Sequence, residues 1–141
     1  MIKELAAQLR RDEGVKRHLY FDSEGYATIG VGRLIDGRRG GGLRDSEIDQ
    51  LLANDITATL SELRNKLPWF GSLDKARQGV LANMAFNLGV AGLLGFRKTL
   101  ALVERGDYEA ASVEMLDSKW ARQVGRRADR LSEQMRTGRW V

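Results

Sequence analysis

Apolar side chains recur at three- to four-residue spacing at the start of the chain, which is the pattern of an amphipathic helix. Gly14 interrupts the pattern, so the sequence predicts a helix over residues 2–13. The next position on the apolar stripe is Glu13, and we therefore expect a carboxylate on the inward face of the last turn. The stripe itself is formed by Ile2, Leu5, Ala6 and Leu9.

The character of the chain changes between residues 16 and 35, where β-branched and aromatic residues are separated by glycines, as in strands and hairpins. Residues 22–25 have the composition of a tight turn, since an aspartate can bond its own backbone and a glycine can take a positive φ. Residues 26–32 predict a strand with one apolar face and one almost bare face. A bare face allows close approach by another backbone or a ligand. The residues on it are Tyr26, Thr28, Gly30 and Gly32.

Residues 37–42 consist of glycine and arginine and predict a flexible loop. Beyond this loop the apolar spacing becomes helical. We expect a long helix that starts with Asp45 as its N-cap and ends before Pro68. Asp107, which follows a glycine, is expected to cap a later helix. The other helices are predicted over residues 72–88, 96–105, 107–117 and 126–136.

These elements predict an α+β fold with a small N-terminal antiparallel sheet lobe and a larger C-terminal helical lobe. We expect a single domain. Its sheet lobe spans residues 14–44, an inter-lobe helix spans 45–66, and the helical lobe combines 1–13 with 67–141. The cleft between the two lobes is where a ligand is expected.

The composition restricts the chemistry. At 141 residues, 43% hydrophobic and 30% charged, the chain has the size and composition of one globular domain. It contains no cysteine, which excludes disulfide scaffolds, cysteine nucleophiles and zinc fingers. His18 is its single histidine, so we expect no metal site and no cofactor. Acid–base chemistry then falls mostly to carboxylates.

The net charge of +4 is unevenly distributed, because residues 119–141 carry seven cations and two anions. Such a patch fits a polyanionic partner (nucleic acid, an anionic membrane or the bacterial cell wall) and equally fits a solvated basic helix. No run of 18 apolar residues is present, so stable membrane insertion is not expected. The first residues are charged throughout and lack the apolar region of a signal peptide.

The most specific candidate group for chemistry is Glu13, Asp22 and Thr28. A helix C-terminus and an inward position both favour the protonated form of Glu13, as a general acid requires. Asp22 in a turn should stay ionised, and Thr28 could hold a water. Two carboxylates in contrasting environments are used in glycoside hydrolysis. The alternative is structural: a solvated glutamate at a helix end and an aspartate that only forms a turn.

A longer pattern resembles the catalytic signature of the phage-type lysozymes, which are endolysins that cleave peptidoglycan. It starts with Glu13-Gly14 and continues through residues 20–32, Tyr-Phe-Asp-Ser-Glu-Gly-Tyr-Ala-Thr-Ile-Gly-Val-Gly. The resemblance implies a lysozyme-like fold with its active-site cleft between the two lobes. Further matches cover nearly the whole chain in the same order, at residues 82–89, 95–96, 118–120, 127–128 and 136–140.

The resemblance implies a role for each residue at a matching position. Glu13 matches the general acid, Asp22 matches the carboxylate that stabilises the transition state and helps to activate water, and Thr28 matches the hydroxyl that positions the water. The family inverts the anomeric carbon. Arg127 matches an arginine that pairs with the catalytic glutamate and orients it. Residues at positions that contact the glycan in the family are Leu34, Phe86, Asn87 and Thr99.

Two features depart from the family pattern. Arg33 stands where the family usually has a histidine that can ion-pair with an aspartate on the inter-lobe helix. Asp55 is the matching aspartate and lies on the apolar stripe of its helix, where an unpaired carboxylate would be costly. We therefore predict a structural ion pair between Arg33 and Asp55. Longer members of the family have extra structure where this chain has only a short loop of glycine and arginine in the segment 35–45. We therefore expect the glycan subsites there to differ from those of the family.

Other interpretations use the same residues. His18 in a serine hydrolase triad lacks any supporting motif. Trp120 and Trp140 could stack on sugars, although tryptophan on a helix more often belongs to a core. The basic C-terminal helix could make the protein a binding module for an anionic polymer, or contact an anionic surface. Nucleic acid is not the expected partner, because no recognition motif accompanies the charge.

The sequence and the resemblance together predict an endolysin. Such an enzyme hydrolyses the β-1,4 bond between N-acetylmuramic acid and N-acetylglucosamine of peptidoglycan. We expect it to act as a monomer, and to reach the wall from the host cytoplasm through a holin-type lesion.

Overall fold

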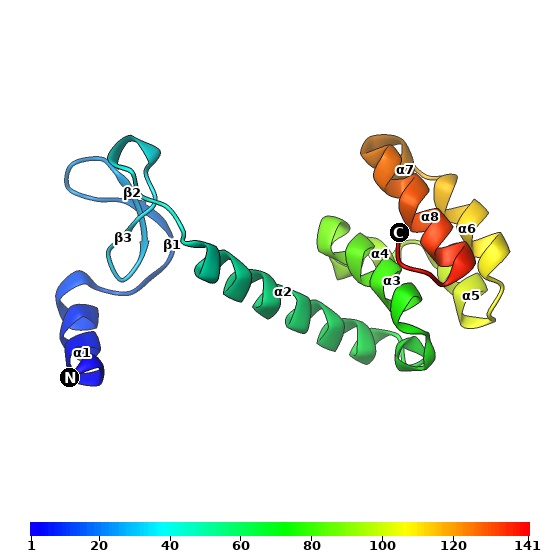
Figure 1. The fold of residues 1–141 in the computed structure, drawn as a ribbon, viewed down its shortest axis with the longest axis horizontal. Coiled ribbons are helices and arrows are strands. Elements are labelled where there is room, and N and C mark those ends of the chain that lie inside the picture. Colours follow the sequence, from blue (N-terminus) through cyan, green and yellow to red (C-terminus); the bar gives the residue numbers. More distant parts are fainter. The chain divides into compact units, whose positions relative to one another are not determined.

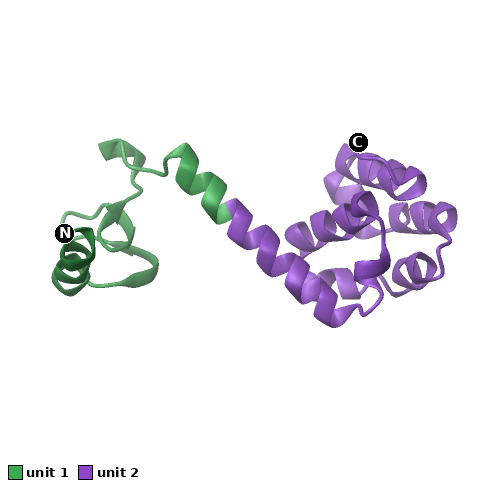
Figure 2. Cartoon of the chain, turned by 60° about the horizontal axis from the view of Figure 1, so that its bottom comes forward, with its two compact units in different colours: residues 1–51 green, residues 52–141 purple.

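The computed structural model describes all 141 residues, and their contacts divide the chain into two compact units (Figure 1). Unit 1 comprises residues 1–51 and unit 2 comprises residues 52–141, as the two colours of Figure 2 show. Helix α2, Asp45–Lys66, is continuous across this boundary. A small antiparallel sheet near the N-terminus and a mostly helical remainder confirm the predicted α+β class. None of the helices combines the length and apolar character that crossing a membrane requires.

Unit 1 contains a three-stranded antiparallel sheet in the order β1-β2-β3. Its register aligns Tyr20 of β1 with Thr28 of β2, and Thr28 with Leu34 of β3. Residues paired in this way project to the same face of a sheet, so these three form a row across it. The bounds of the strands are Lys16–Phe21 for β1, Ala27–Gly30 for β2 and Arg33–Leu34 for β3.

Helix α1, Ile2–Glu13, has the predicted bounds, and Gly14 ends it with a φ of 78°. None of its residues is buried. Glu13 is exposed within unit 1, and its predicted inward position stays a prediction. The assignment of residues 1–13 to the helical lobe stays a prediction.

Two predicted starts of helices are corrected by the capping contacts. The carbonyl of Arg44 accepts the first helical hydrogen bonds of α2, and the Glu47 carboxylate accepts the Arg44 amide at 2.7 Å. Arg44 thus stands in the N-cap position and Asp45 is already helical. Helix α3, Lys75–Leu88, starts later than the predicted residue 72, because Asp74 caps it by accepting from the Arg77 amide at 3.0 Å.

Unit 2 is a cluster of short helices after the end of α2. The prediction located three of these helices to within one residue, and Asp107 caps α6 as expected. Helices α4 and α7 were not predicted. The elements are η2 Phe70–Ser72, α3, α4 Val90–Leu94, α5 Arg97–Glu104, α6 Tyr108–Leu116, α7 Lys119–Val124 and α8 Arg126–Thr137.

A continuous apolar core holds unit 2 together. Leu63 and Leu67 extend it to the end of α2, and Phe70 is fully buried within it. Trp120 belongs to this core, whereas Trp140 is 68% exposed, so the core interpretation is wrong for Trp140. Trp140 follows α8 rather than lying on a helix, and its ring lies over a glycine of α3.

Arg77 on α3 fastens the end of α8. Its guanidinium donates to the Met135 carbonyl at 2.7 Å and to the Arg136 carbonyl at 3.0 Å. The same group stacks on the Tyr108 ring, with its central carbon 3.6 Å from the ring centroid. It also forms an ion pair with Asp74 at 2.9 Å. The mostly buried side chain of Arg77 therefore connects α3, α6 and α8.

Candidate active site

One face of the unit 1 sheet forms a cavity of about 180 Å³. Its base is the row of side chains that the strand register creates across the sheet. The predicted catalytic residues Glu13, Asp22 and Thr28 all line it, and so does Leu34, which was predicted to contact substrate. The complete lining is Glu13, Tyr20, Asp22, Thr28, Gly32, Leu34 and Arg39.

Glu13 reaches this cavity from the last turn of α1 and lies against Gly32. A Cβ added to Gly32 would be 3.0 Å from Glu13 Oε2 and 3.1 Å from its Cδ. Gly32 also has a φ of 65°, a conformation that side-chain-bearing residues rarely adopt. This is the close approach that the bare strand face predicted. The glycine therefore makes room for the carboxylate and provides the turn into β3.

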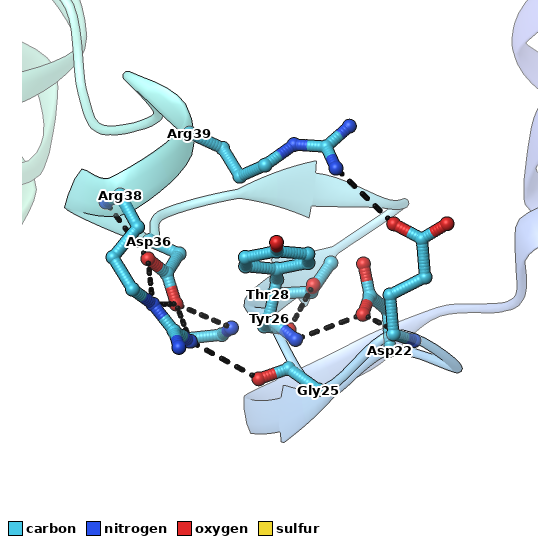
Figure 3. Close-up of polar contacts among 9 residues, drawn as sticks. Asp22, Gly25, Tyr26, Thr28, Asp36, Arg38 and Arg39 are labelled. Atoms are coloured by element: carbon cyan, nitrogen blue, oxygen red, sulfur yellow. Dashed lines mark hydrogen bonds and ion pairs between the residues drawn. The ribbon is translucent and has the colours of Figure 1, made fainter.

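Asp22 is held by the turn that it starts. Its Oδ1 accepts hydrogen bonds from the amides of Glu24 at 2.9 Å and Tyr26 at 2.8 Å. Two further bonds close the turn, from the Asp22 amide to the Tyr26 carbonyl and from the Gly25 amide to the Asp22 carbonyl. Both donors bind the same oxygen (Figure 3), which leaves Oδ2 without a protein donor.

Thr28 is almost completely buried in the sheet, with 4% of its surface exposed. Its hydroxyl donates to the Tyr26 carbonyl at 2.9 Å, as Figure 3 shows. Because the hydroxyl proton is used in this bond, the oxygen can only accept a further hydrogen bond. A water bound to it must therefore donate a hydrogen bond to the Thr28 oxygen, which leaves a lone pair of the water free for attack.

The segment after β3 contains a short helix, so the loop prediction for residues 37–42 is wrong in its first half. Gly37–Arg39 forms a short 3₁₀ helix, η1, capped by the 9%-exposed Asp36. The Arg38 guanidinium bonds both carboxylate oxygens of Asp36, the shortest contact being 2.6 Å. These bonds from Arg38 hold the pKa of Asp36 well below its usual range. Asp36 also accepts from the Ala27 amide at 3.4 Å, which ties the segment to β2.

Sequence reasoning missed the residues around the turn that holds Asp22. Arg39 lines the cavity, pairs with Glu24 at 3.1 Å and stacks on Tyr26. The available signal was the pair of arginines two and three residues after an aspartate in a segment otherwise made of glycine, because a short acidic–basic sequence can form its own cap and ion pair. The glycine and arginine content by itself predicts only a flexible loop.

Within unit 1, Arg33 pairs with Glu47 at 2.6 Å and donates to the Gly42 carbonyl at 3.3 Å. Asp55 belongs to unit 2, so its predicted ion pair with Arg33 stays a prediction. The hydrogen bond and positive charge of Arg33 lower the pKa of Glu47 to about 2, and Glu47 reciprocally raises the pKa of Arg33.

The remaining predicted site residues lie in unit 2 and line different surfaces. Phe86 and Arg127 line a cavity of about 450 Å³. Thr99 lines another, of about 650 Å³, although only 2% of its surface is exposed. Asn87 lines neither cavity, and its amide oxygen accepts from Trp120 Nε1 at 3.0 Å.

Arg127 is oriented by a neighbour within unit 2. Its guanidinium donates to Asn83 Oδ1 at 2.7 and 2.9 Å, and to the Asn83 carbonyl at 3.3 Å. The predicted pairing of Arg127 with Glu13 stays a prediction. No group of three or more histidine, cysteine, aspartate or glutamate side chains is placed to hold a metal ion.

Comparison with known proteins agrees with this arrangement. The model of the phage lysozyme family matches residues 10–137. Probable T4-type lysozyme 2 of Dictyostelium discoideum is 27% identical over 164 aligned residues, which cover 98% of this chain and 96% of that protein. Pre-baseplate central spike protein Gp5 of Enterobacteria phage T4 is 31% identical over 159 residues, which cover 95% of this chain but 28% of that protein.

A family match over this length supports lysozyme-like hydrolysis of peptidoglycan, and therefore a glycoside hydrolase. The resemblance inferred from the residues around Glu13, Asp22 and Thr28 is confirmed at the level of the family. The chain belongs to the phage lysozyme family.

Proposed function

We propose that the protein hydrolyses the β-1,4 bond between N-acetylmuramic acid and N-acetylglucosamine, with inversion at the anomeric carbon. The observation that carries the proposal is that Glu13, Asp22 and Thr28 line one cavity of unit 1. These side chains provide an acid, a second carboxylate and a hydroxyl that can only accept from a bound water. Inverting glycosidases need this combination, with the two carboxyl groups roughly 6.5–9.5 Å apart so that a water fits between carboxylate and sugar.

In the proposed reaction, Glu13 gives its proton to the glycosidic oxygen as the bond from that oxygen to the anomeric carbon breaks. Positive charge develops on the sugar ring, and the ionised Asp22 stabilises it. A water held by Thr28 attacks the anomeric carbon from the opposite face, and Asp22 accepts a proton from it. The products are a free leaving-group hydroxyl and a new reducing end of muramic acid. Exchange of protons with solvent restores both carboxyl groups.

The cellular setting is part of the same proposal. We infer an endolysin that acts as a monomer from the host cytoplasm and reaches the wall through a holin-type lesion. The basic residues near the C-terminus would contact the anionic wall or membrane surface. This contact is supported by the charge of residues 119–141, of which Arg136 is neutralised locally by Glu133 at 2.6 Å.

The test is the clearing of purified peptidoglycan by the wild type and by Glu13→Gln, with chemical analysis of the released ends. The substitution preserves shape and removes the acidic proton, so we expect a loss of about 10²–10⁴-fold in rate. New muramic acid ends from the wild type, initially as the inverted anomer in NMR spectra, would support the proposal. Retention of configuration at the anomeric carbon would contradict the inverting mechanism but not the hydrolysis of the glycosidic bond.

A matched control is Glu104→Gln, which changes another glutamate at the end of a helix but lies outside the cavity. Its rate should equal that of the wild type. A wild-type protein that binds the wall and releases no sugar ends would contradict the enzymatic proposal and favour a binding module. Binding of nucleic acid that weakens steeply with salt would favour the remaining alternative.

A further inference from the structure

The backbone of Tyr26 contacts two of the three proposed catalytic residues. Its amide donates to Asp22 Oδ1 at 2.8 Å, and its carbonyl accepts from the Thr28 hydroxyl at 2.9 Å. The same carbonyl accepts from the Asp22 amide at 2.9 Å. One residue therefore fixes which oxygen of Asp22 stays open and which way the hydroxyl of Thr28 points.

Tyr26 lies outside the regular strand, because β2 begins at Ala27 and the preceding Gly25 has a φ of 83°. Its peptide groups make their hydrogen bonds to the turn and to Thr28, and these alone are a weak restraint on a residue beside a glycine. Its side chain supplies a second restraint, described next.

Two arginines of η1 stack on the Tyr26 ring. The central guanidinium carbons of Arg38 and Arg39 lie 4.9 and 4.8 Å from the ring centroid. In the view of Figure 3, Arg39 is drawn above the ring and Arg38 below it. A guanidinium over an aromatic ring is attracted by the electron density of the ring face.

Each of these arginines is anchored at a second point. Arg38 bonds the buried Asp36 and donates to the Gly25 carbonyl at 3.3 Å. Arg39 pairs with Glu24 at 3.1 Å. The anchors Gly25 and Glu24 belong to the catalytic turn itself, so the 3₁₀ segment and the turn are joined on both sides of Tyr26.

We propose that Tyr26, clamped between Arg38 and Arg39, is the positioning residue that keeps Asp22 and Thr28 in register with one bound water. This proposal rests on the proposed function, because it assigns Tyr26 a part in that reaction. Arg38 and Arg39 act through Tyr26. Residues 36–39 thus belong to the catalytic apparatus although none of them takes part in proton transfer.

The experiment compares kcat and KM on purified peptidoglycan for Tyr26→Ala, Tyr26→Phe, Arg39→Gln and Arg39→Lys. Tyr26→Ala removes the ring, and we expect kcat to fall by about 10- to 100-fold with KM unchanged, since a small misplacement of catalytic groups has effects of that size. Arg39→Gln should lower kcat less, by a few-fold. Tyr26→Phe keeps the ring face and Arg39→Lys keeps a cation over it, so both should stay close to the wild type.

A matched control is Arg44→Gln, which removes one positive charge from unit 1 at a side chain that is 77% exposed and does not contact Tyr26. It should leave kcat and KM unchanged. If kcat fell as much in Arg44→Gln as in Arg39→Gln, the cause would be the loss of positive charge from unit 1 and not the loss of the contact with Tyr26. That result would overturn the proposal.

The outcomes separate the two levels of inference. A wild type that releases no muramic acid ends contradicts the proposed function. An active wild type combined with an unchanged kcat in Tyr26→Ala overturns the positioning role alone. A raised KM with unchanged kcat in Arg39→Gln overturns it as well, because Arg39 would then contact substrate directly. If Tyr26→Ala does not fold, the Arg39→Gln and Arg39→Lys pair decides: no difference between them in kcat overturns the proposal.

Discussion

Different interactions stabilise the interior of each of the two units. In unit 2, nineteen buried residues form one apolar core, with Phe70, Met84 and Met135 fully enclosed. In unit 1, the buried residues are Thr28 and Asp36, and both are polar. Hydrogen bonds, ion pairs and cation–π contacts therefore define the geometry of unit 1, where the proposed catalytic residues lie.

This difference separates stability from chemistry. Apolar burial contributes free energy without precise direction, whereas hydrogen bonds to a carboxylate or hydroxyl fix the orientation of individual atoms. Substitutions in unit 2 should therefore change mainly the free energy of unfolding. Substitutions in unit 1 should change mainly the turnover of a protein that still folds. The following predictions test this separation.

The largest effect is expected for Phe70→Ala in unit 2. Phe70 is fully buried, so its truncation should lower the free energy of unfolding by about 3–5 kcal/mol through lost burial and the cavity left behind. Denaturant titration measures this loss. Activity per folded molecule should be unchanged. The exposed Val113→Ala is the control and should stay within about 0.5 kcal/mol; a loss below that value for Phe70→Ala would contradict the role given to the core.

Thr28→Val should have the reverse signature. Valine keeps the shape of the side chain and removes the oxygen that would accept from the water, so we expect turnover to fall by about 100-fold. The free energy of unfolding should fall by only about 1 kcal/mol, because one hydrogen bond to the Tyr26 carbonyl is lost. Counting released reducing ends and melting the same samples gives both values. Thr28→Ser should retain most activity, and an active Thr28→Val would exclude the hydroxyl from the reaction.

Gly32→Ala should affect both properties moderately. The positive φ of Gly32 should cost about 1–2 kcal/mol with a side chain, and the new methyl would press on the Glu13 carboxylate. We expect a measurable loss of stability together with slower turnover. Gly71→Ala in unit 2 is the control, because it has neither a positive φ nor an atom within 4 Å of the added methyl. Equal effects in the two variants would refute the contact between Gly32 and Glu13.

The smallest effect is expected at the ion pair between Arg33 and Glu47, and it depends on pH. Folding lowers the pKa of Glu47 from 4.5 to about 2, mainly through the hydrogen bond from Arg33. The folded state therefore binds this proton less readily than the unfolded state. The stabilising contribution is complete above pH 4.5 and is lost as the pH falls towards 2. Glu47→Gln should lower the melting temperature slightly at pH 6 and leave it unchanged near pH 2; the same difference at both values would contradict the pair.

The sequence predicted the elements whose signal is local and repeated. The 3.6-residue spacing located α1, α2 and the longer helices of unit 2. Helices α4 and α7, with five and six residues, are too short to show a period. The start of α2 was misplaced because the Glu47 side chain bonds back to the Arg44 amide, a contact that an aspartate at the next position obscured.

The candidate site was partly predictable for the same reason. The family motif carries Glu13, Asp22 and Thr28, and the fold of unit 1 brings all three to one cavity. The contacts of Tyr26 with Arg38 and Arg39 join residues 12 and 13 positions apart, and no pattern in the sequence specifies them. The partner of Arg33 likewise depended on the path of the segment between β3 and α2, which composition alone does not determine.

The hydrogen bonds from Arg77 to the end of α8 affect the order in which the two units can fold during synthesis on the ribosome. Arg77 receives its carbonyl partners 58 and 59 residues later in translation, so the core of unit 2 cannot close until α8 has emerged. The ion pairs of unit 1 span at most 15 residues along the chain. Its sheet and the turn that holds Asp22 can therefore form while most of unit 2 is still being translated, as expected for N-terminal structure during synthesis.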